Sequence, residues 1–197
     1  MFLENTLYSN EQFGWIEVIC GSMFSGKTEE LIRRIKRAKI ANQSIKVFKP
    51  YIDSRSKNFI ESHDENKFES IEVQTASEIL TQTDACQVVA IDEAQFFDDK
   101  IVDVCNIMAN NGKRVIVAGL DMDYLGNPFG PMPNLMAISE TVTKVHAVCK
   151  KTGNIANYSF RKNNKKNVIL IGEKDKYEAV SRSVFYKKMN KNKLKWK

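Results

Sequence analysis

Along the first two thirds of the chain, short apolar runs alternate with segments whose apolar residues recur every three or four positions. Continuous apolar runs predict strands at 15–20, 45–49, 88–92 and 114–120. Helical spacing predicts helices at 27–40 and from a cap at Asp98 or Asp99 to just before Gly112, and Thr75 or Ser77 is expected to cap a short helix that runs through Leu80. Strands separated by helices are typical of α/β proteins. The pattern therefore predicts a parallel sheet flanked by helices over residues 1–145.

Two polar regions of this domain are expected to face solvent. The stretch 53–66 is polar and aperiodic, which predicts a mobile surface loop long enough to carry function. The helix at 27–40 carries a basic stripe that we interpret as a solvated face. Glu30 stands four residues before Arg34, a spacing that supports such a face with an ion pair.

The pattern changes at about His146. Short β-like pieces at 157–160 and 167–172 predict a small hairpin lobe over residues 146–190. Residues 191–197 are predicted to form a basic tail, and we expect the whole lysine-rich end, from residue 187, to be solvated and frayed.

Composition places the chain among ordinary globular proteins. Hydrophobic residues make up 43% and charged residues 27% of its 197 residues, values that exclude disordered and collagen-like chains. No apolar run approaches the roughly 18–20 residues needed to cross a bilayer, and the N-terminus lacks the features of an export signal. The four cysteines form no C-x-x-C pair, so no disulfide scaffold is indicated. We therefore expect a cytoplasmic protein with free thiols and no membrane partner.

The net charge of +6 hides an asymmetry. Residues 1–145 carry 15 Lys and Arg against 21 Asp and Glu, whereas residues 146–197 carry 15 against 3. A basic segment of this kind allows affinity for nucleic acid or for an anionic membrane. We favour a solvated terminus and expect no specific nucleic-acid partner.

Candidate chemistry begins with the pattern G-x-x-x-x-G-K-[ST], which follows one predicted strand and opens a predicted helix. Its residues are Gly21, Ser22, Met23, Phe24, Ser25, Gly26, Lys27 and Thr28. Glycines let the backbone curl its N–H groups around phosphates, and a helix N-terminus favours negative charge. Lys27 is therefore the candidate for contacting the outer phosphates of ATP, and Thr28 the candidate for a Mg²⁺ ligand.

A second candidate pair stands at the end of the strand at 88–92. Asp92 is suited to complete the Mg²⁺ shell, and Glu93 is suited to take a proton from an attacking hydroxyl group. Three functions remain open at this point: a kinase, a DNA-dependent ATPase, and a non-catalytic nucleotide-binding module. The ATPase would use the basic segment after residue 145 as its DNA surface. The binding module would leave Glu93 unexplained.

Further motifs separate these functions. In chain order they are Gly21–Thr28, Asp53-Ser54-Arg55, Ser62-His63-Asp64, Ile91-Asp92-Glu93-Ala94-Gln95-Phe96-Phe97, Leu120-Asp121, Pro128-Phe129-Gly130 and Asp175-Lys176-Tyr177. Together they resemble the thymidine kinases of the cellular, bacterial and poxviral class. The resemblance extends from about Gly14 to Lys188, nearly the whole chain, and is far more specific than the phosphate loop alone.

This resemblance implies transfer of the γ-phosphoryl group of ATP to the 5′-hydroxyl group of deoxythymidine, which gives the monophosphate. It implies that Glu93 is the general base, and that Lys27 acts with it on the transferred group. Arg55 is implied to support that group when its loop closes, and Asp53 lies in the same loop with a less defined role. The resemblance also implies a homotetramer and feedback inhibition by dTTP.

Residues for the nucleoside follow from the same resemblance. Phe96 matches the aromatic residue that packs on the thymine ring, and Ser159 matches a small polar position near the thymine methyl group. The implied nucleoside-binding residues are Met23, Phe96, Leu120, Tyr124, Phe129, Ser159, Ile171, Gly172 and Tyr177. The C-terminal lobe is implied to fold over the base as a lasso-like loop that excludes water.

One family feature is expected to be missing. Thymidine kinases of this class commonly hold a structural zinc ion on two C-x-x-C pairs, whose positions correspond here to Cys149, Thr152, Ser181 and Val184. One thiolate, two hydroxyl groups and a valine are a poor donor set for zinc. We therefore expect no zinc, and predict that the lobe is held by an apolar core of Ile155, Tyr158, Phe160, Val168, Leu170, Val180, Val184 and Phe185.

Overall fold

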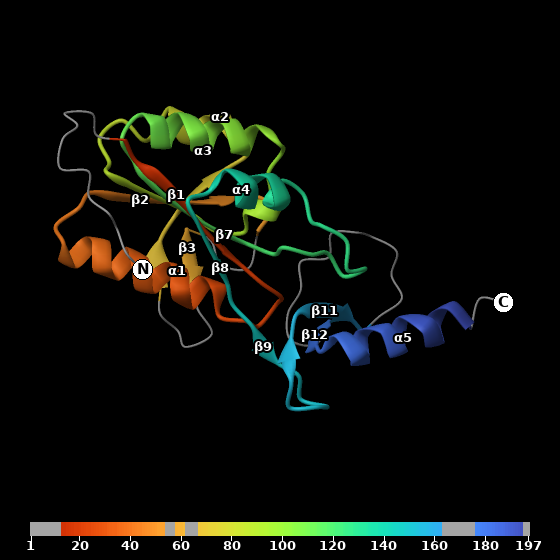
Figure 1. Ribbon diagram of the computed structural model, residues 1–197. Coiled ribbons are helices and arrows are strands. Elements are labelled where there is room, and N and C mark those ends of the chain that lie inside the picture. The colour runs from red at the N-terminus through yellow and green to blue at the C-terminus, as the bar shows by residue number, and fades with distance from the viewer. Residues whose placement is uncertain (1–12, 54–57, 62–66, 163–175, 195–197) are drawn as a thin grey trace.

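The structure is a computed structural model that describes residues 13–53, 58–61, 67–162 and 176–194. At its centre lies a sheet whose strands run in the order β5-β2-β6-β7-β1-β8 (Figure 1). Their bounds are β1 Trp15–Cys20, β2 Ile45–Pro50, β5 Ile71–Val73, β6 Val88–Ile91, β7 Arg114–Gly119 and β8 Thr141–Lys144. Neighbouring strands in this sheet are parallel, so their carboxyl ends meet at one edge, where α/β sheets bind ligands. The predicted fold class is confirmed.

Helices cover both faces of the sheet (Figure 1). On one face lies α1 (Lys27–Ile40), and on the other lie α2 (Ser77–Leu80), α3 (Lys100–Asn110) and α4 (Met132–Ile138). Side chains alternate along a strand, and β1 shows the result. Val18 and Cys20 join the core on the α3 side, whereas Ile19 joins the core under α1.

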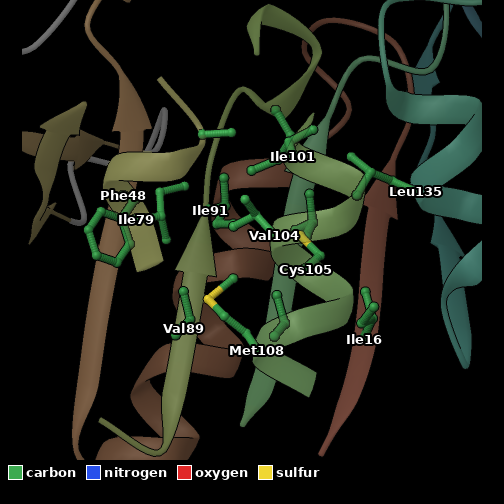
Figure 2. Close-up of a cluster of buried hydrophobic side chains, with 14 of the residues drawn as sticks. Ile16, Phe48, Ile79, Val89, Ile91, Ile101, Val104, Cys105, Met108 and Leu135 are labelled. Atoms are coloured by element: carbon green, nitrogen blue, oxygen red, sulfur yellow. The ribbon is translucent and has the colours of Figure 1, made fainter. Parts of the chain in front are cut away.

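The larger core lies between α3 and the sheet (Figure 2). It buries the residues whose helical spacing predicted the helix, namely Ile101, Val104, Cys105 and Met108. Burying side chains of this size contributes about 1.5–3 kcal/mol each. Gly112, with a φ of 79°, follows the helix as predicted. Asp99, one of the two residues predicted as the cap, is the N-cap residue of α3, but its side chain makes no capping hydrogen bond. The cap predicted for α2 at Thr75 or Ser77 was wrong, because Ala76 is its N-cap residue.

Several elements of the body, the strand β5 among them, are absent from the predicted pattern. Within the stretch predicted as an irregular loop, β3 (Phe59–Glu61) pairs antiparallel with β4 (Lys67–Glu69). Ile60 anchors this hairpin, since it is buried against the core under α1. The helix α4 and the strand β8 are absent from the predicted elements. Both are short, and α4 begins beside Pro131, so their local signals are weak.

A smaller lobe follows the sheet. Its elements are β9 Ala147–Val148, β10 Ile155–Ala156, β11 Tyr158–Arg161, β12 Tyr177–Val180 and α5 Arg182–Leu194. The pairs β9–β10 and β11–β12 are antiparallel, which is the hairpin character that the sequence predicts. The strand predicted at 167–172 lies outside the described residues, as does the implied lasso-like loop. The predicted domain boundaries stay predictions.

The lobe has a small apolar core of its own. Tyr158 and Phe185 stack with ring centroids 4.4 Å apart, and Val180 is buried beside them. Ile155 was wrongly assigned to this core, because Ala156 takes the inward position on β10 and leaves Ile155 59% exposed. The predicted core residues at 168 and 170 lie outside the described residues.

The lysine-rich C-terminus is also ordered further than predicted. Instead of fraying from residue 187, α5 continues to Leu194. Met189 packs against the lobe core. Lys188 pairs with Glu178 at 2.5 Å, and its ammonium group lies 4.2 Å from the centre of the Phe160 ring. The packing of one face against the lobe thus stabilises this helix, although its composition alone predicts a solvated segment. No helix in the described part of the chain is long and apolar enough to span a membrane.

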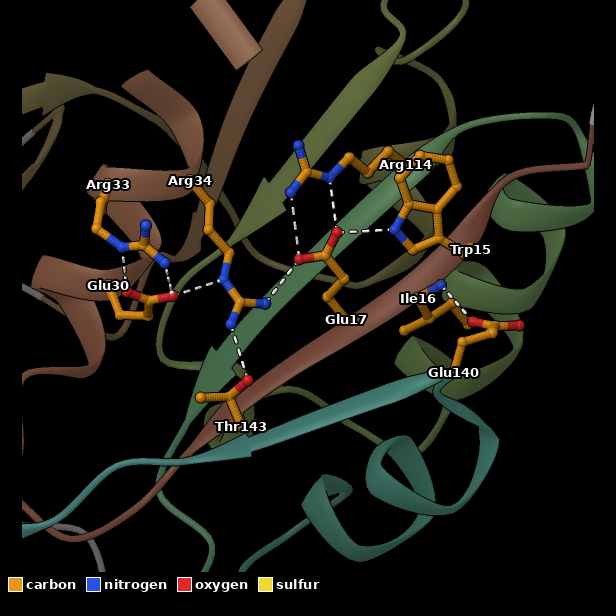
Figure 3. A network of polar contacts seen from close by, with 9 residues as sticks. All are labelled: Trp15, Ile16, Glu17, Glu30, Arg33, Arg34, Arg114, Glu140 and Thr143. Atoms are coloured by element: carbon orange, nitrogen blue, oxygen red, sulfur yellow. Dashed lines mark hydrogen bonds and ion pairs between the residues drawn. The ribbon is translucent and has the colours of Figure 1, made fainter. Parts of the chain in front are cut away.

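A buried acidic residue on β1 accepts hydrogen bonds from three neighbouring side chains (Figure 3). Glu17 accepts hydrogen bonds from Trp15 Nε1 at 2.7 Å, from Arg114 Nε at 2.7 Å and from Arg34 Nη1 at 2.6 Å. Burial acts to raise the pKa of Glu17, but the hydrogen bonds from Arg114 and Trp15 and the nearby positive charges outweigh it and leave the pKa below its usual value.

This network corrects the interpretation of the basic stripe on α1. Arg34 is only 11% exposed at its side chain, and its Nη2 donates to Thr143 Oγ1 on β8 at 2.8 Å. The predicted pair with Glu30 does form, at 2.8 Å (Figure 3). Helical spacing alone places Arg34 on the outer side of α1. The acidic side chain beneath it on β1 explains why Arg34 points inward.

Candidate active site

The phosphate loop joins β1 to α1 at the carboxyl edge of the sheet. Gly21 lies so close to the β8 end that an added Cβ atom would be 2.2 Å from the Val145 carbonyl oxygen. Gly26, the N-cap residue of α1, takes a φ of 86°, which favours glycine. Lys27 is buried and donates to the Ser22 carbonyl at 2.8 Å. The motif therefore has the strand–loop–helix setting that phosphate binding requires.

Asp92 follows β6 and lies beside the start of α1. Thr28 Oγ1 donates to Asp92 Oδ2 at 3.2 Å, and the Glu93 N–H donates to Asp92 Oδ1 at 2.9 Å. Both acidic side chains are buried. A hydroxyl group and a carboxylate are oxygen donors of the kind that Mg²⁺ takes, with water completing the shell. The donor set of Thr28 and Asp92 therefore fits a Mg²⁺ ion.

Glu93 is held by a residue to which the sequence analysis gave no role. Gln95 is 3% exposed, and its Nε2 donates to Glu93 Oε2 at 2.5 Å. The other end of the same amide, Oε1, accepts the Leu120 N–H at 2.9 Å. Space around it is tight, since a Cβ atom added at Gly119 would lie 2.9 Å from that Oε1. One buried amide thus ties the Glu93 carboxylate to the segment after β7.

The clues to Gln95 were partly visible in the sequence. Gln95 stands in the same quoted motif as Asp92 and Glu93. Its partner Leu120 is 25 positions away, however, and no local pattern joins the two. Glu93 itself takes a φ of 53°, a left-handed conformation that is uncommon outside glycine. That turn directs the chain from β6 into the short helix η1 (Ala94–Phe96).

Some of the predicted nucleoside residues meet in this part of the body. Phe96 and Phe129 contact each other edge to face, with ring centroids 5.8 Å apart and planes at 88°. Phe96 closes η1, whereas Phe129 belongs to the loop between β7 and α4. Leu120 begins that loop and is joined through Gln95 to the Glu93 carboxylate.

The lobe contacts the phosphate loop directly. The Met23 N–H donates to Ser159 Oγ at 2.9 Å, and Ser22 Oγ donates to the Ala156 carbonyl at 2.8 Å. Two predicted nucleoside residues, Met23 and Ser159, are therefore in contact although they are 136 positions apart. The strands β10 and β11 bring them together.

A second contact joins the lobe to the loop after β7, which reaches toward β11 and β12 (Figure 1). The guanidinium carbon of Arg161 lies 3.7 Å from the centre of the Tyr124 ring. Arg161 Nη2 also donates to the Tyr177 hydroxyl at 2.7 Å. Gly126 packs close to the lobe core, because a Cβ atom there would lie 3.2 Å from Phe185. The structure thus unites Tyr124 and Tyr177 through an arginine that sequence reasoning missed.

Three of the predicted site residues, Arg55, Ile171 and Gly172, lie outside the described residues. Asp53 lies within them and is buried just after β2. The Lys49 ammonium group donates to the Asp53 carbonyl at 3.3 Å and lies 3.3 Å from a carboxylate oxygen of Glu72. Asp53 therefore stands at the same sheet edge as Asp92.

The positions that correspond to the family's zinc ligands hold hydrogen-bonding and apolar groups. Thr152 Oγ1 donates to Ser181 Oγ at 3.3 Å, and Val184 packs on the lobe core. Burial acts to raise the pKa of Cys149, but hydrogen bonds from Thr152 and from Ser181 lower it to about 6. Among the described residues, no three His, Cys, Asp or Glu side chains are grouped as metal ligands. This donor set does not fit zinc.

Taken together, a parallel sheet, a phosphate loop after β1 and a buried Asp-Glu pair after β6 define a phosphate-loop nucleotide-binding protein. Comparison with known proteins gives the family within this class. The family model for thymidine kinase matches residues 14–185. The chain belongs to the thymidine kinase family.

Individual relatives agree over nearly the whole chain. The chain is 52% identical over 186 residues to a thymidine kinase of Bacteroides thetaiotaomicron, with 94% of each chain covered. It is 50% identical over 196 residues to one of Bacteroides fragilis, with 99% of this chain and 98% of the relative covered. A Rhodothermus thymidine kinase is 56% identical over 173 residues, which cover 87% of this chain and 81% of the relative. A solved structure of the Legionella pneumophila ATPase DotB has a TM-score of 0.39 at 15% identity, and the match covers 64% of this chain and 34% of the DotB chain.

Proposed function

We propose that this protein transfers the γ-phosphoryl group of ATP to the 5′-hydroxyl group of deoxythymidine, with dTMP and ADP as products. The observation that carries the proposal is the hydrogen-bonded link from Thr28 through Asp92 to Glu93. It joins the residue assigned as the base, through the neighbouring carboxylate, to the end of the phosphate loop. A protein that only binds nucleotides has no use for such a base. Membership of the thymidine kinase family supports the two substrates.

At the ATP end, residues 21–28 would receive the phosphates. Lys27 and the N-terminus of α1 supply positive charge there. Thr28 and Asp92 would hold Mg²⁺, which when bound neutralises charge on the phosphate oxygens. We assign Arg55 to the transferred phosphoryl group and Asp53 to the same closing segment, as the family resemblance implies.

At the reacting hydroxyl group, Glu93 would act as general base. Its carboxylate takes the 5′-hydroxyl proton as the oxygen bonds to the γ-phosphorus atom. The bond between that phosphorus and the bridging oxygen breaks, and ADP leaves. Gln95 holds one oxygen of the Glu93 carboxylate and thereby fixes its orientation. Positioning of this kind is the chief contribution a protein makes to phosphoryl transfer.

At the nucleoside end, the body and the lobe would enclose the thymine base. Phe96 and Phe129 offer aromatic surface from the body, beside Leu120. The remaining assigned contacts are Met23, Tyr124, Ser159, Ile171, Gly172 and Tyr177. Closing the pocket from both sides keeps out water, which otherwise competes as phosphoryl acceptor.

Further properties belong to the same proposal. We assign the protein to the cytoplasm and propose a homotetramer that dTTP inhibits by binding in the nucleoside site. We also propose that the lobe needs no zinc ion. The donor set around Cys149 supports this last point, because hydroxyl groups and a valine stand where thiolates would be needed.

Measuring ADP release tests the function directly. Purified protein is supplied with ATP and Mg²⁺ and, in separate reactions, with deoxythymidine, deoxycytidine or single-stranded DNA. We expect deoxythymidine to give ADP and dTMP in equal amounts, with little turnover of deoxycytidine. The Lys27→Ala variant, prepared identically, controls for contaminating kinases. Release stimulated by DNA and indifferent to nucleosides would instead identify a DNA-dependent ATPase.

A further inference from the structure

Arg161 lies at the junction between the lobe and the loop after β7. Its side chain is 5% exposed, and it stands on β11 directly opposite Tyr177 on β12. Nη2 donates to the Tyr177 hydroxyl at 2.7 Å and Nε donates to the same oxygen at 3.2 Å. The guanidinium carbon lies over the Tyr124 ring, 3.7 Å from its centre.

Two properties of the guanidinium group are used at once. Its edge carries several N–H donors in one plane, and two of them converge on a single phenol oxygen. Its carbon atom lies over an aromatic ring, where a buried cation is attracted to the π electrons. A lysine ammonium group offers neither the paired donors nor the flat face.

The partners of Arg161 come from different parts of the molecule. Tyr124 belongs to the loop that follows β7 of the body, and Tyr177 belongs to β12 of the lobe. The two ends of the segment 163–175 are also held here, since the Lys162 N–H donates to the Lys176 carbonyl at 2.9 Å. Arg161 therefore fixes the two tyrosines relative to each other.

We infer that Arg161 is a positioning residue that sets the affinity for the nucleoside by holding Tyr124 and Tyr177 in place. The inference rests on the proposed function, which gives both tyrosines to the nucleoside pocket. Lys27 contacts Ser22 in the phosphate loop and Glu93 contacts Gln95 after β6, whereas Arg161 contacts Tyr124 and Tyr177 on the lobe side. Its loss should therefore weaken nucleoside binding while phosphoryl transfer at saturating nucleoside continues.

Steady-state kinetics of Arg161→Met test this inference. Losing charge-assisted hydrogen bonds should raise KM for thymidine about 10- to 100-fold, with kcat and KM for ATP little changed. Arg161→Lys keeps the charge and should fall between Arg161→Met and wild type. If Arg161→Met does not fold, the KM for thymidine of Arg161→Lys tests the inference instead. The matched control is Arg182→Met, because Arg182 lies in the same lobe 5.2 Å from the Tyr158 ring, with neither Tyr124 nor Tyr177 as its ring partner.

A double-mutant cycle with Tyr177→Phe separates positioning from general weakening of the lobe. If Arg161 acts through the Tyr177 hydroxyl, Arg161→Met should raise KM for thymidine much less in the Tyr177→Phe background than in wild type. Fully additive effects, or an Arg161→Met variant that behaves like Arg182→Met, would overturn the inference. Wild-type protein that fails to phosphorylate thymidine would instead defeat the proposed function itself, so the two failures are distinguishable.

Discussion

At the carboxyl edge of the sheet, neighbouring groups of the body hold the Asp92 and Glu93 side chains, whereas at the junction with the lobe one arginine joins a tyrosine of the body to a tyrosine of the lobe. Lys27, Asp92 and Glu93 each follow a strand of the parallel sheet within a few residues. Tyr124 and Tyr177 both contact Arg161. Under the proposed function, the two regions should affect different kinetic constants: variants of Glu93 should lower kcat, whereas variants at the junction with the lobe should raise KM for thymidine.

The largest effect is expected at the base. Glu93→Gln should lower kcat about 10²- to 10⁴-fold, because it removes general-base catalysis, while thymidine and ATP still bind. Steady-state turnover together with thymidine binding by calorimetry measures both quantities. Asp103→Asn, an exposed change on α3, is the control and should behave as wild type. A Glu93→Gln enzyme with near-normal kcat would mean that another residue takes the proton.

The second prediction tests whether the lobe unfolds independently of the body. Phe185→Ala should lower the free energy of unfolding by about 3–5 kcal/mol, because it removes the ring that stacks on Tyr158 and leaves a cavity. Hydrogen exchange should show the loss of protection confined to β11, β12 and α5. Met108→Ala in α3, which should cost about 2–5 kcal/mol, is the counterpart in the body. Equal loss of protection in β1 and β6 after Phe185→Ala would show that the two regions unfold as one.

A smaller effect is expected from the buried ion network of the body. The pKa of Glu17 is lowered in the folded protein, so its ionised form contributes stability above about pH 4.5 and loses it as the pH falls further. Glu17→Gln should therefore destabilise by about 1.5–3 kcal/mol at pH 7, and the difference from wild type should shrink below pH 4.5. Denaturant unfolding at several pH values measures this.

The control for that prediction lies on the same helix. Arg33, 59% exposed at its side chain, pairs with Glu30 on the surface of α1. Arg33→Met should cost less than about 1 kcal/mol. A Glu17→Gln variant that loses no more than Arg33→Met, or whose deficit does not depend on pH, would contradict the assigned network.

The smallest effect is expected from treatment with a zinc chelator, because we predict that the lobe holds no zinc ion. Elemental analysis of protein purified without a metal-binding tag should give far less than one zinc ion per chain. A zinc-selective chelator, with Mg²⁺ supplied, should change neither Tm nor activity. One zinc ion per chain that leaves together with activity would contradict this and would require donors other than those around Cys149.

The sequence predicted the body better than the lobe for a physical reason. Strands such as Val88–Ile91 are continuous apolar runs, and the phosphate loop is a contiguous pattern, so both are readable locally. Ile155 and the C-terminal helix were misjudged because their burial depends on which neighbour packs against them. Arg34 shows the same limit within the body, since its partner Glu17 lies 17 positions away on a strand.

Site residues divide in the same way. The motif at 21–28 and the pair Asp92-Glu93 were found from residue type and spacing alone. The nucleoside residues came from family resemblance, because an isolated Phe or Tyr is indistinguishable from core packing. Neither residue spacing nor family resemblance identified Gln95 or Arg161 as a site residue. Their roles depend on contacts with Leu120 and Tyr124, which only the folded chain brings within reach.

The contact between the phosphate loop and the lobe has a thermodynamic consequence. Because Met23 donates to Ser159 and Ser22 donates to Ala156, ordering one of these segments helps to order the other. Whichever substrate binds first then removes part of the entropic cost for the second. Linkage requires the benefit to be mutual, so ATP should tighten nucleoside binding by the same factor by which the nucleoside tightens ATP binding.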